Sequence, residues 1–71
     1  MTPNQIERAG RILFGSNWKT EFADHFLIDK RFLRRLLAGS IMIPDGLLLE
    51  IETALREHGQ KLDDLMLEIT Q

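Results

Sequence analysis

The stretch KTEFADHFLIDKRFLRRLLA, residues 19–38, decides how the rest of the chain is interpreted. In its first half Phe22 and Phe26 stand four residues apart, and in its second half Leu33 and Leu37 do the same. Apolar residues that recur at this interval lie on one face of an α-helix. The stretch therefore predicts two helices, each with an apolar stripe, joined by a tight turn.

Between the two halves stands Asp29, whose short acidic side chain makes a good N-cap for the second helix. Four cations follow at spacings that place them together on one helix face, opposite the leucines. They are Lys30, Arg31, Arg34 and Arg35. Like charges at this spacing repel by ~0.2–0.5 kcal/mol per pair. The face therefore favours an anionic partner, and DNA is the obvious polyanion.

The composition fits one small domain. The chain has 71 residues, and 44% of them are hydrophobic, which can support a compact helical core. Every candidate element repeats at helical spacing, so an all-α fold is expected. The absence of cysteine excludes a disulfide scaffold and a thiolate zinc site, and it fits a reducing cytoplasm. Because there is no leader and no apolar run of membrane length, we expect a soluble, cytoplasmic protein.

The net charge of −2 hides an asymmetry between the two halves of the chain. Residues 1–40 carry seven Lys and Arg against four Asp and Glu, which gives +3. Residues 41–71 carry two against seven, which gives −5. Because the local field steers association, a polarised molecule of this kind remains compatible with a nucleic-acid partner.

A first helix is expected to precede the central stretch. Thr2 can cap it, and Gln5 completes a capping box at the third helical position. Gly15 is expected to end it in a left-handed conformation. Gly10 lies inside this helix, where it costs roughly 1 kcal/mol against alanine. It marks either a close helix crossing or a tolerated surface glycine.

Beyond the central stretch, Pro44 is expected to open a fourth helix that stops at Gly59. Residues 60–71 then form a fifth helix whose apolar residues repeat at i, i+3, i+4 and i+7, with acidic residues opposite. These apolar residues are Leu62, Leu65, Met66 and Ile69. They form either a dimer surface, which Leu49 could join, or a face buried against the first helix. The expectation is a single compact five-helix domain over residues 1–71.

With these residues in place, the chain resembles the lambda-repressor-like helix-turn-helix family, the XRE, phage Cro and repressor type. It is most similar to short phage or prophage forms. The likeness covers residues 17–58 well, with its helix-turn-helix core at 19–38, and extends loosely to both ends. The residues that carry it are Asn17, Trp18, Ala23, Arg31, Arg34, Arg35, Ala38, Gly39, Ile43 and Pro44.

The resemblance implies a sequence-specific regulator of transcription, a small repressor that binds double-stranded operator DNA as a homodimer. Half-sites would lie about one helical turn (~34 Å) or a multiple apart. The second helix of the pair would enter the major groove, with its cations reading base edges. The implied base-reading residues are Lys30, Arg31, Arg34 and Arg35.

Contacts to the DNA backbone are expected at the start of the first helix of the pair, where backbone donors and the helix dipole favour a phosphate. The contacts expected there are Asn17, Trp18, Lys19 and Thr20, and Ser40 is expected to make a further one after the second helix. Trp18 has a second interpretation as a lid on the core, and both can hold because an indole can pack while its N–H donates.

The turn departs from the family pattern. The family usually has glycine there, where a positive φ is convenient, and this chain has Leu27. Either the turn is reshaped, or Leu27 adopts the left-handed conformation at a cost of about 1 kcal/mol.

No enzymatic function is expected. His25 and His58 lie on different predicted helices, and no nucleophile, base and acid have a distinctive spacing. We also expect no metal, cofactor, small-molecule ligand or membrane partner. The alternative to a DNA-binding regulator is a protein-interaction module, such as an antitoxin or a phage assembly adaptor, whose basic helix docks an acidic partner. The two functions predict a different salt dependence of DNA binding and a different effect of removing one arginine on that binding.

Overall fold

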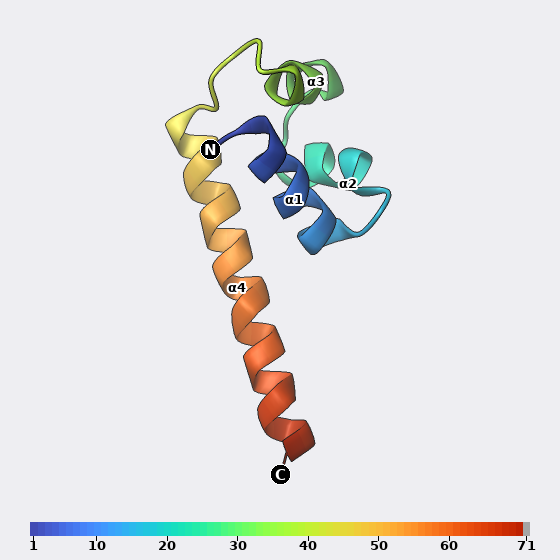
Figure 1. The fold of residues 1–71 in the computed structure, drawn as a ribbon, viewed down its shortest axis with the longest axis vertical. Helices are drawn as coiled ribbons and strands as arrows, with labels where there is room; N and C mark the ends of the chain where they lie inside the picture. Colours follow the sequence, from blue (N-terminus) through green and yellow to red (C-terminus); the bar gives the residue numbers. More distant parts are fainter. Residues whose placement is uncertain (71) are drawn as a thin grey trace.

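The computed structural model describes residues 1–70, which form four helices and no strand (Figure 1). The expected all-α class is confirmed, and the expected count of five helices is wrong. The helices are α1 (Pro3–Phe14), α2 (Trp18–His25), α3 (Lys30–Ala38) and α4 (Asp45–Thr70).

The difference in count arises at Gly59, which does not end a helix. Residues 45–70 form one continuous helix through it. A glycine in a helix interior costs only about 1 kcal/mol against alanine. The residues that follow support the helix, and the Gln60 side-chain amide donates to Asp64 Oδ1 at 3.0 Å.

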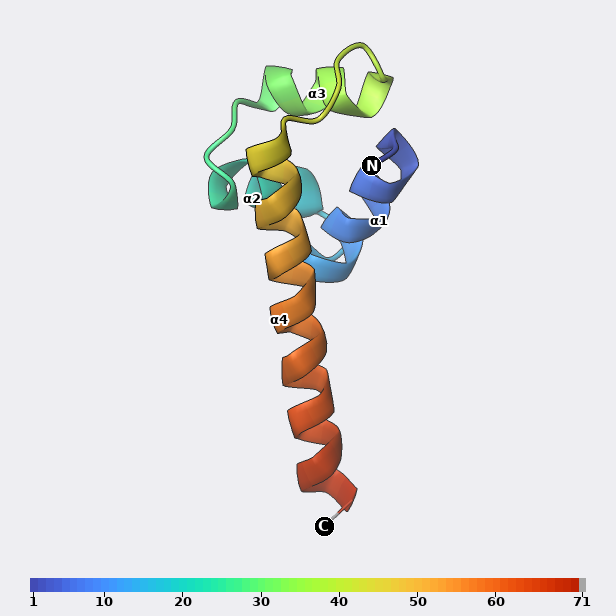
Figure 2. The same cartoon turned by 90° about the vertical axis from the view of Figure 1, so that its left-hand side faces the viewer.

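Two parts of the molecule differ in shape. The head consists of α1, α2, α3 and the N-terminal half of α4, with α1 in contact with each of the other three helices. The stem is the remainder of α4, residues 59–70. Figures 1 and 2 show the stem projecting beyond the head, which agrees with the overall extents of 47 × 23 × 20 Å. Gln71, the last residue of the expected fifth helix, lies outside the described residues.

An aromatic cluster lies at the centre of the head. The rings of Trp18 and Phe22 meet edge to face at 5.5 Å, and Phe22 lies 4.7 Å from Phe26. Such ring pairs add about 0.5–1.5 kcal/mol beyond their buried area. The buried core residues are Ile6, Ala9, Trp18, Phe22, Ala23, Phe26, Leu33, Leu36, Leu47 and Ile51.

Most helix ends lie at the capping residues predicted from the sequence. Thr2 and Gln5 form the expected capping box, with the Gln5 N–H donating to Thr2 Oγ1 at 3.2 Å. Gly15 ends α1 as expected, but its φ of 86° and ψ of −161° lie outside the expected left-handed helical conformation. Gly39 ends α3 in the left-handed region with a φ of 75°. Asn17 occupies the N-cap position of α2, but its side chain makes no capping hydrogen bond.

The start of α4 also differs slightly from the expectation. The sequence predicts Pro44 at the first helical position, but the helix begins one residue later, at Asp45. The Pro44 carbonyl accepts from the Leu48 N–H at 3.0 Å, so Pro44 holds the N-cap position. None of the described helices is both long enough and apolar enough to cross a membrane.

The apolar face of the stem is open. Leu62, Leu65, Met66 and Ile69 are 53%, 52%, 59% and 69% exposed. The interpretation that buries these residues against α1 is therefore wrong. The same face is buried toward the N-terminal end of α4, where Ile51 packs in the core of the head.

Candidate nucleic-acid interface

The connection between α2 and α3 is short and tightly bonded. The Ile28 N–H donates to the Ala23 carbonyl at 2.9 Å, and the Phe26 N–H donates to the Phe22 carbonyl at 3.0 Å. Leu27 has a φ of 55°, so of the two alternatives for this turn the structure adopts the left-handed leucine. This hydrogen-bond pattern matches the glycine-type termination of a helix, here made by a leucine that is 91% exposed.

Asp29 begins α3 in the expected manner. Its carboxylate Oδ1 accepts from the Arg31 backbone N–H at 2.7 Å, and its backbone is extended, as an N-cap requires. On the inner side of α3, Leu33 and Leu36 are buried in the core of the head. The cap and the two leucines fix the rotation of α3 and therefore fix which side chains face outward.

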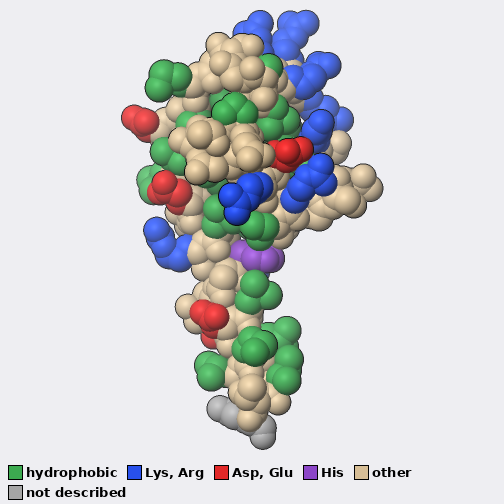
Figure 3. Space-filling view, in the orientation of Figure 1, with side chains coloured by type: hydrophobic (Ala, Val, Ile, Leu, Met, Phe, Trp, Pro, Cys, Tyr) green, Lys and Arg blue, Asp and Glu red, His purple; other side chains and the backbone are tan. Residues whose placement is uncertain are grey.

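The outward face of α3 is cationic and open. Lys30, Arg31, Arg34 and Arg35 are all exposed. None of them pairs with a carboxylate within residues 1–70, where the observed ion pair joins Arg11 to Glu7 on α1. Figure 3 shows most of the Lys and Arg side chains gathered at the upper right, over the end of the molecule where α3 lies. The geometry thus leaves four repelling cations with no internal counter-charge.

Lys19 joins this face from α2. A hollow of about 250 Å³ is lined by Lys19 together with Lys30, Leu33, Arg34 and Leu37 of α3. An expected backbone contact and two expected base-reading residues therefore border one depression. Their positive charges add to the positive potential at the N-terminal ends of α2 and α3.

The other expected backbone contacts are placed unequally. Asn17 and Thr20 are exposed beside Lys19 at the start of α2. Ser40 is exposed as well, but it follows the C-terminal end of α3, away from that cluster. Trp18 is 1% exposed, which confirms its interpretation as part of the core. Its expected contact to the DNA backbone stays a prediction, because a packed indole can still donate through its N–H.

One cation near this face was missed from the sequence. Arg11 of α1 lines a hollow of about 460 Å³ together with Ser16, Asn17, Trp18, Lys19 and Thr20. Arg11 is exposed and shares its charge with Glu7 at 3.4 Å. No local pattern signals this placement, because it depends on the angle at which α1 meets α2.

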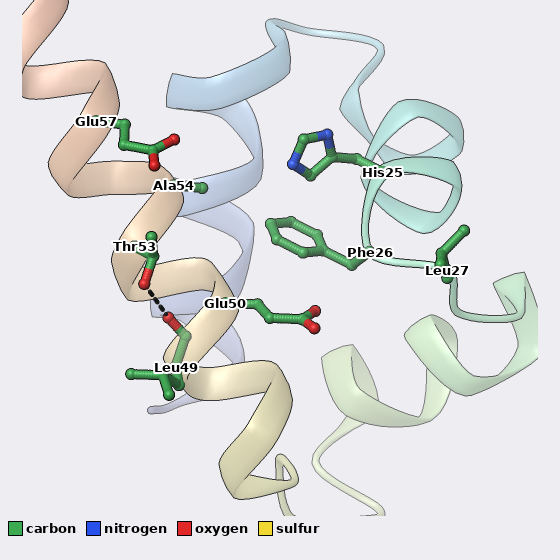
Figure 4. A pocket seen from close by; sticks show the side chains of 8 residues that line it. All are labelled: His25, Phe26, Leu27, Leu49, Glu50, Thr53, Ala54 and Glu57. Carbon is green, nitrogen blue, oxygen red and sulfur yellow. Dashed lines mark hydrogen bonds between the residues drawn. The ribbon is translucent and has the colours of Figure 1, made fainter.

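A second side of the head carries a different hollow, shown in Figure 4. Its volume is about 380 Å³, and it lies between the C-terminal end of α2 and α4. The Thr53 hydroxyl donates to the Leu49 carbonyl at 2.9 Å, so it is already engaged. The lining residues are His25, Phe26, Leu27, Leu49, Glu50, Thr53, Ala54 and Glu57. This hollow brings together no nucleophile and base in hydrogen-bond contact.

Leu49 was expected to be able to join the dimer surface of the stem, and the structure separates it from that surface. Positions 49 and 62 are 13 residues apart, which at about 100° per residue places them roughly 140° apart around α4. Leu49 instead borders the hollow of Figure 4, across which Leu27 lies on the opposite side. It therefore shares no face with Leu62 and its neighbours.

Comparisons with protein-family models, with curated proteins and with solved structures found no match. Within residues 1–70, no group of three His, Cys, Asp or Glu side chains is placed to hold a metal ion. The chemistry that the α3 face offers is polyvalent binding of an anion, through guanidinium forks that match phosphate and guanine edges.

Proposed function

We propose that this protein is a sequence-specific double-stranded DNA-binding regulator, a small cytoplasmic repressor of the phage or prophage type. The observation that carries the proposal is the open face of α3, where four exposed cations have no internal counter-charge. A solvated surface gains nothing from repelling cations at helical spacing. A polyanion that runs along this face converts the repulsion into binding energy and releases counterions.

The dimensions of α3 suit the major groove of DNA. An α-helix with its side chains is about 10–12 Å across, and the major groove is about 12 Å wide. In the proposed complex Arg31, Arg34 and Arg35 reach base edges, where arginine forms bidentate contacts to guanine. Lys30 lies in the first turn and takes either a base or a phosphate. At least one of these cations contacts phosphate, since half or more of protein–DNA hydrogen bonds do so.

The start of α2 supplies the backbone contacts in this proposal. The free N–H groups of a helix N-terminus and its dipole favour a phosphate. Lys19 and Thr20 lie at this end, and Lys19 borders the same hollow as Lys30 and Arg34. Phosphate contacts here would hold α3 in register without reading sequence.

The charge distribution over the rest of the molecule supports an orientation in which the α3 end faces the DNA. Acidic side chains predominate along α4, whose N-terminal end lies near α3 and whose stem points away from it (Figure 1). They are Asp45, Glu50, Glu52, Glu57, Asp63, Asp64 and Glu68. DNA would repel this helix and attract the α3 end, so the polarity steers the encounter.

The test is fluorescence anisotropy with DNA fragments that flank the coding region of the protein, at several salt concentrations. Wild type is compared with Arg34→Ala, and Arg56→Ala is the matched control. Arg56 is an exposed arginine on α4 that lies outside the α3 face. We expect tight binding to one fragment, falling steeply with salt, that Arg34→Ala weakens by at least about tenfold, equal to 1.4 kcal/mol. Arg56→Ala should bind like wild type.

Weak binding that is equal on all fragments and indifferent to Arg34 would overturn the proposal. It would favour the alternative, a module whose basic α3 face docks an acidic protein. Equal losses in Arg34→Ala and Arg56→Ala would show that only overall charge matters, which also contradicts sequence-specific reading.

A further inference from the structure

The exposed apolar face of the stem continues the face of α4 that packs in the head. Leu62 and Ile69 follow Leu55 at intervals of seven residues, and Leu65 follows Ile51 at twice that interval. A repeat of seven keeps residues on one side of a helix, with a drift of only ~20° per repeat. In Figure 3 most of the green side chains of the stem lie on the same side as the head. The open face therefore lies directly beneath the head.

We propose that a second copy of this chain covers this face, with the two stems packed antiparallel. A two-fold axis between Leu65 and Met66 places Leu62 of one copy opposite Ile69 of the other. All four exposed apolar positions of each stem are then covered by the same four positions of its partner. This is a self-complementary contact that closes at two copies.

The head excludes the parallel arrangement. In a parallel, in-register pair, the second α4 would run upward along the same face of the first. Higher in the helix that face is occupied by α1 and by the core around Ile51. The second helix would overlap the head. Residues 59–70 of an antiparallel partner avoid this clash, because its Ile69 lies opposite Leu62, below the head, and its own head lies beyond the opposite end.

Charges along the stem favour the same direction. Lys61 and Glu68 are seven residues apart, so they lie on the same edge of the apolar face. In an antiparallel pair, equivalent edges meet, and Lys61 of one copy lies near Glu68 of the other. The contact is formed twice because of the two-fold axis. In a parallel pair the edge that carries Lys61 would meet the opposite edge, beside Met66, and this charge pair would be lost.

The end of the partner stem also meets a suitable surface. A hollow of about 170 Å³ lies where the head meets the stem. Leu13, Phe14, His58 and Lys61 are among the residues that line it. The proposed axis brings Ile69 of the second copy opposite Leu62, next to this hollow. Leu13 and Phe14, which are only partly buried, would then contact an apolar side chain.

One consequence of this arrangement rests on the proposed DNA-binding function. The axis lies about 20 residues along α4 from Asp45, which is ~30 Å. Because α3 lies near the N-terminal end of α4 in both views, the two α3 helices would be at opposite ends of the dimer, more than ~60 Å apart (Figures 1 and 2). Half-sites one turn (~34 Å) apart would not fit this dimer. Half-sites two or more turns apart, or two separate DNA segments, would fit it.

The first measurement is self-association of the full chain by sedimentation equilibrium without DNA. Leu65→Glu is compared with Leu67→Glu, because Leu67 is equally exposed, at 60%, but points to the other side of the stem. We expect a concentration-dependent dimer whose dissociation constant rises more than ~tenfold in Leu65→Glu, since a carboxylate would be buried in the contact. Leu67→Glu should dimerise like wild type.

The second measurement fixes the direction of the stems. The sequence contains no cysteine, so Leu62→Cys and Ile69→Cys each introduce a single thiol. One of the two variants is isotope-labelled so that their masses differ, the two are mixed in a glutathione redox buffer, and the crosslinked products are distinguished by mass. Antiparallel packing predicts the mixed 62–69 disulfide as the main product, and each variant alone should crosslink poorly.

Three results would overturn the inference. Wild type could remain a monomer up to millimolar concentration, or Leu65→Glu and Leu67→Glu could weaken association equally. The 62–62 and 69–69 products could also predominate over the mixed one, which would show parallel stems. Because neither measurement contains DNA, failure of the stem dimer is distinguishable from failure of the DNA-binding proposal.

Discussion

Gly10 of α1 lies directly against the ring of Trp18. A β-carbon at Gly10 would overlap the indole atoms Cε3 and Cδ2 and would lie 2.6 Å from Cζ3. Real β-carbons essentially never approach other atoms this closely, so only glycine lets α1 pass over the ring. Of the two interpretations of Gly10, the close crossing is therefore correct, and it sets the distance between α1 and α2.

Replacing Gly10 with alanine should destabilise the head, although alanine is the better helix former. Trp18 is 1% exposed and cannot move away without disturbing the aromatic core. Overpacking of this kind costs roughly 1–3 kcal/mol. We expect a clear fall in the urea midpoint of Gly10→Ala. Gly46→Ala is the control, because a β-carbon there meets nothing within 4 Å. An unchanged midpoint in Gly10→Ala would mean that the crossing is looser than described.

The opposite result is expected for Gly59→Ala. Gly59 is helical, and a β-carbon added to it also meets nothing within 4 Å. Alanine should therefore stabilise the continuous α4 by up to about 1 kcal/mol and raise the helical signal in circular dichroism. If Gly59 ended a helix in the left-handed conformation, alanine would instead cause strain and loss of helix. The sign of the change thus distinguishes one long helix from two short ones.

The glycines show where sequence reasoning succeeds and where it fails. Gly15 and Gly39 both end helices at positive φ, and the chain after each of them turns back to pack on the head. Gly59 has the same local appearance, but the stem after it makes no tertiary contact that would require a turn. Whether a glycine ends a helix depends on that contact, which a local pattern does not contain.

Leu27 offers a test of the strained turn. Its φ of 55° is costly for a residue with a β-carbon, by about 1–2 kcal/mol. Its side chain is 91% exposed, so truncation loses almost no packing. Leu27→Gly should raise the free energy of unfolding by up to about 1 kcal/mol, after the greater freedom of glycine in the unfolded chain is subtracted. Leu27→Ala keeps the strain and serves as the control. A fall in stability with glycine would show that Leu27 makes a contact that outweighs its strain.

The site was predictable to the extent that it is built on one helix. Spacing alone placed Lys30 and the three arginines on the open side of α3, because Leu33 and Leu36 define the opposite side. The position of Lys19 beside them, and that of Arg11 nearby, depends on how the helices pack. Sequence reasoning therefore found the α3 face but not the hollows that connect it to α1 and α2.

Lys19 allows the proposed division between phosphate and base contacts to be tested. Lys19 borders the same hollow as Arg34, yet it lies at the N-terminus of α2, where a phosphate is favoured. Lys19→Ala should weaken binding to operator and unrelated DNA by the same factor and lower the salt slope by about 1. Arg34→Ala should instead reduce the preference for the operator, because it removes a contact to base edges. Anisotropy titrations of both variants on both DNAs separate these effects. If Lys19→Ala also lost the operator preference, the Lys19 side chain would contact a base edge. This result would contradict its assignment to the DNA backbone.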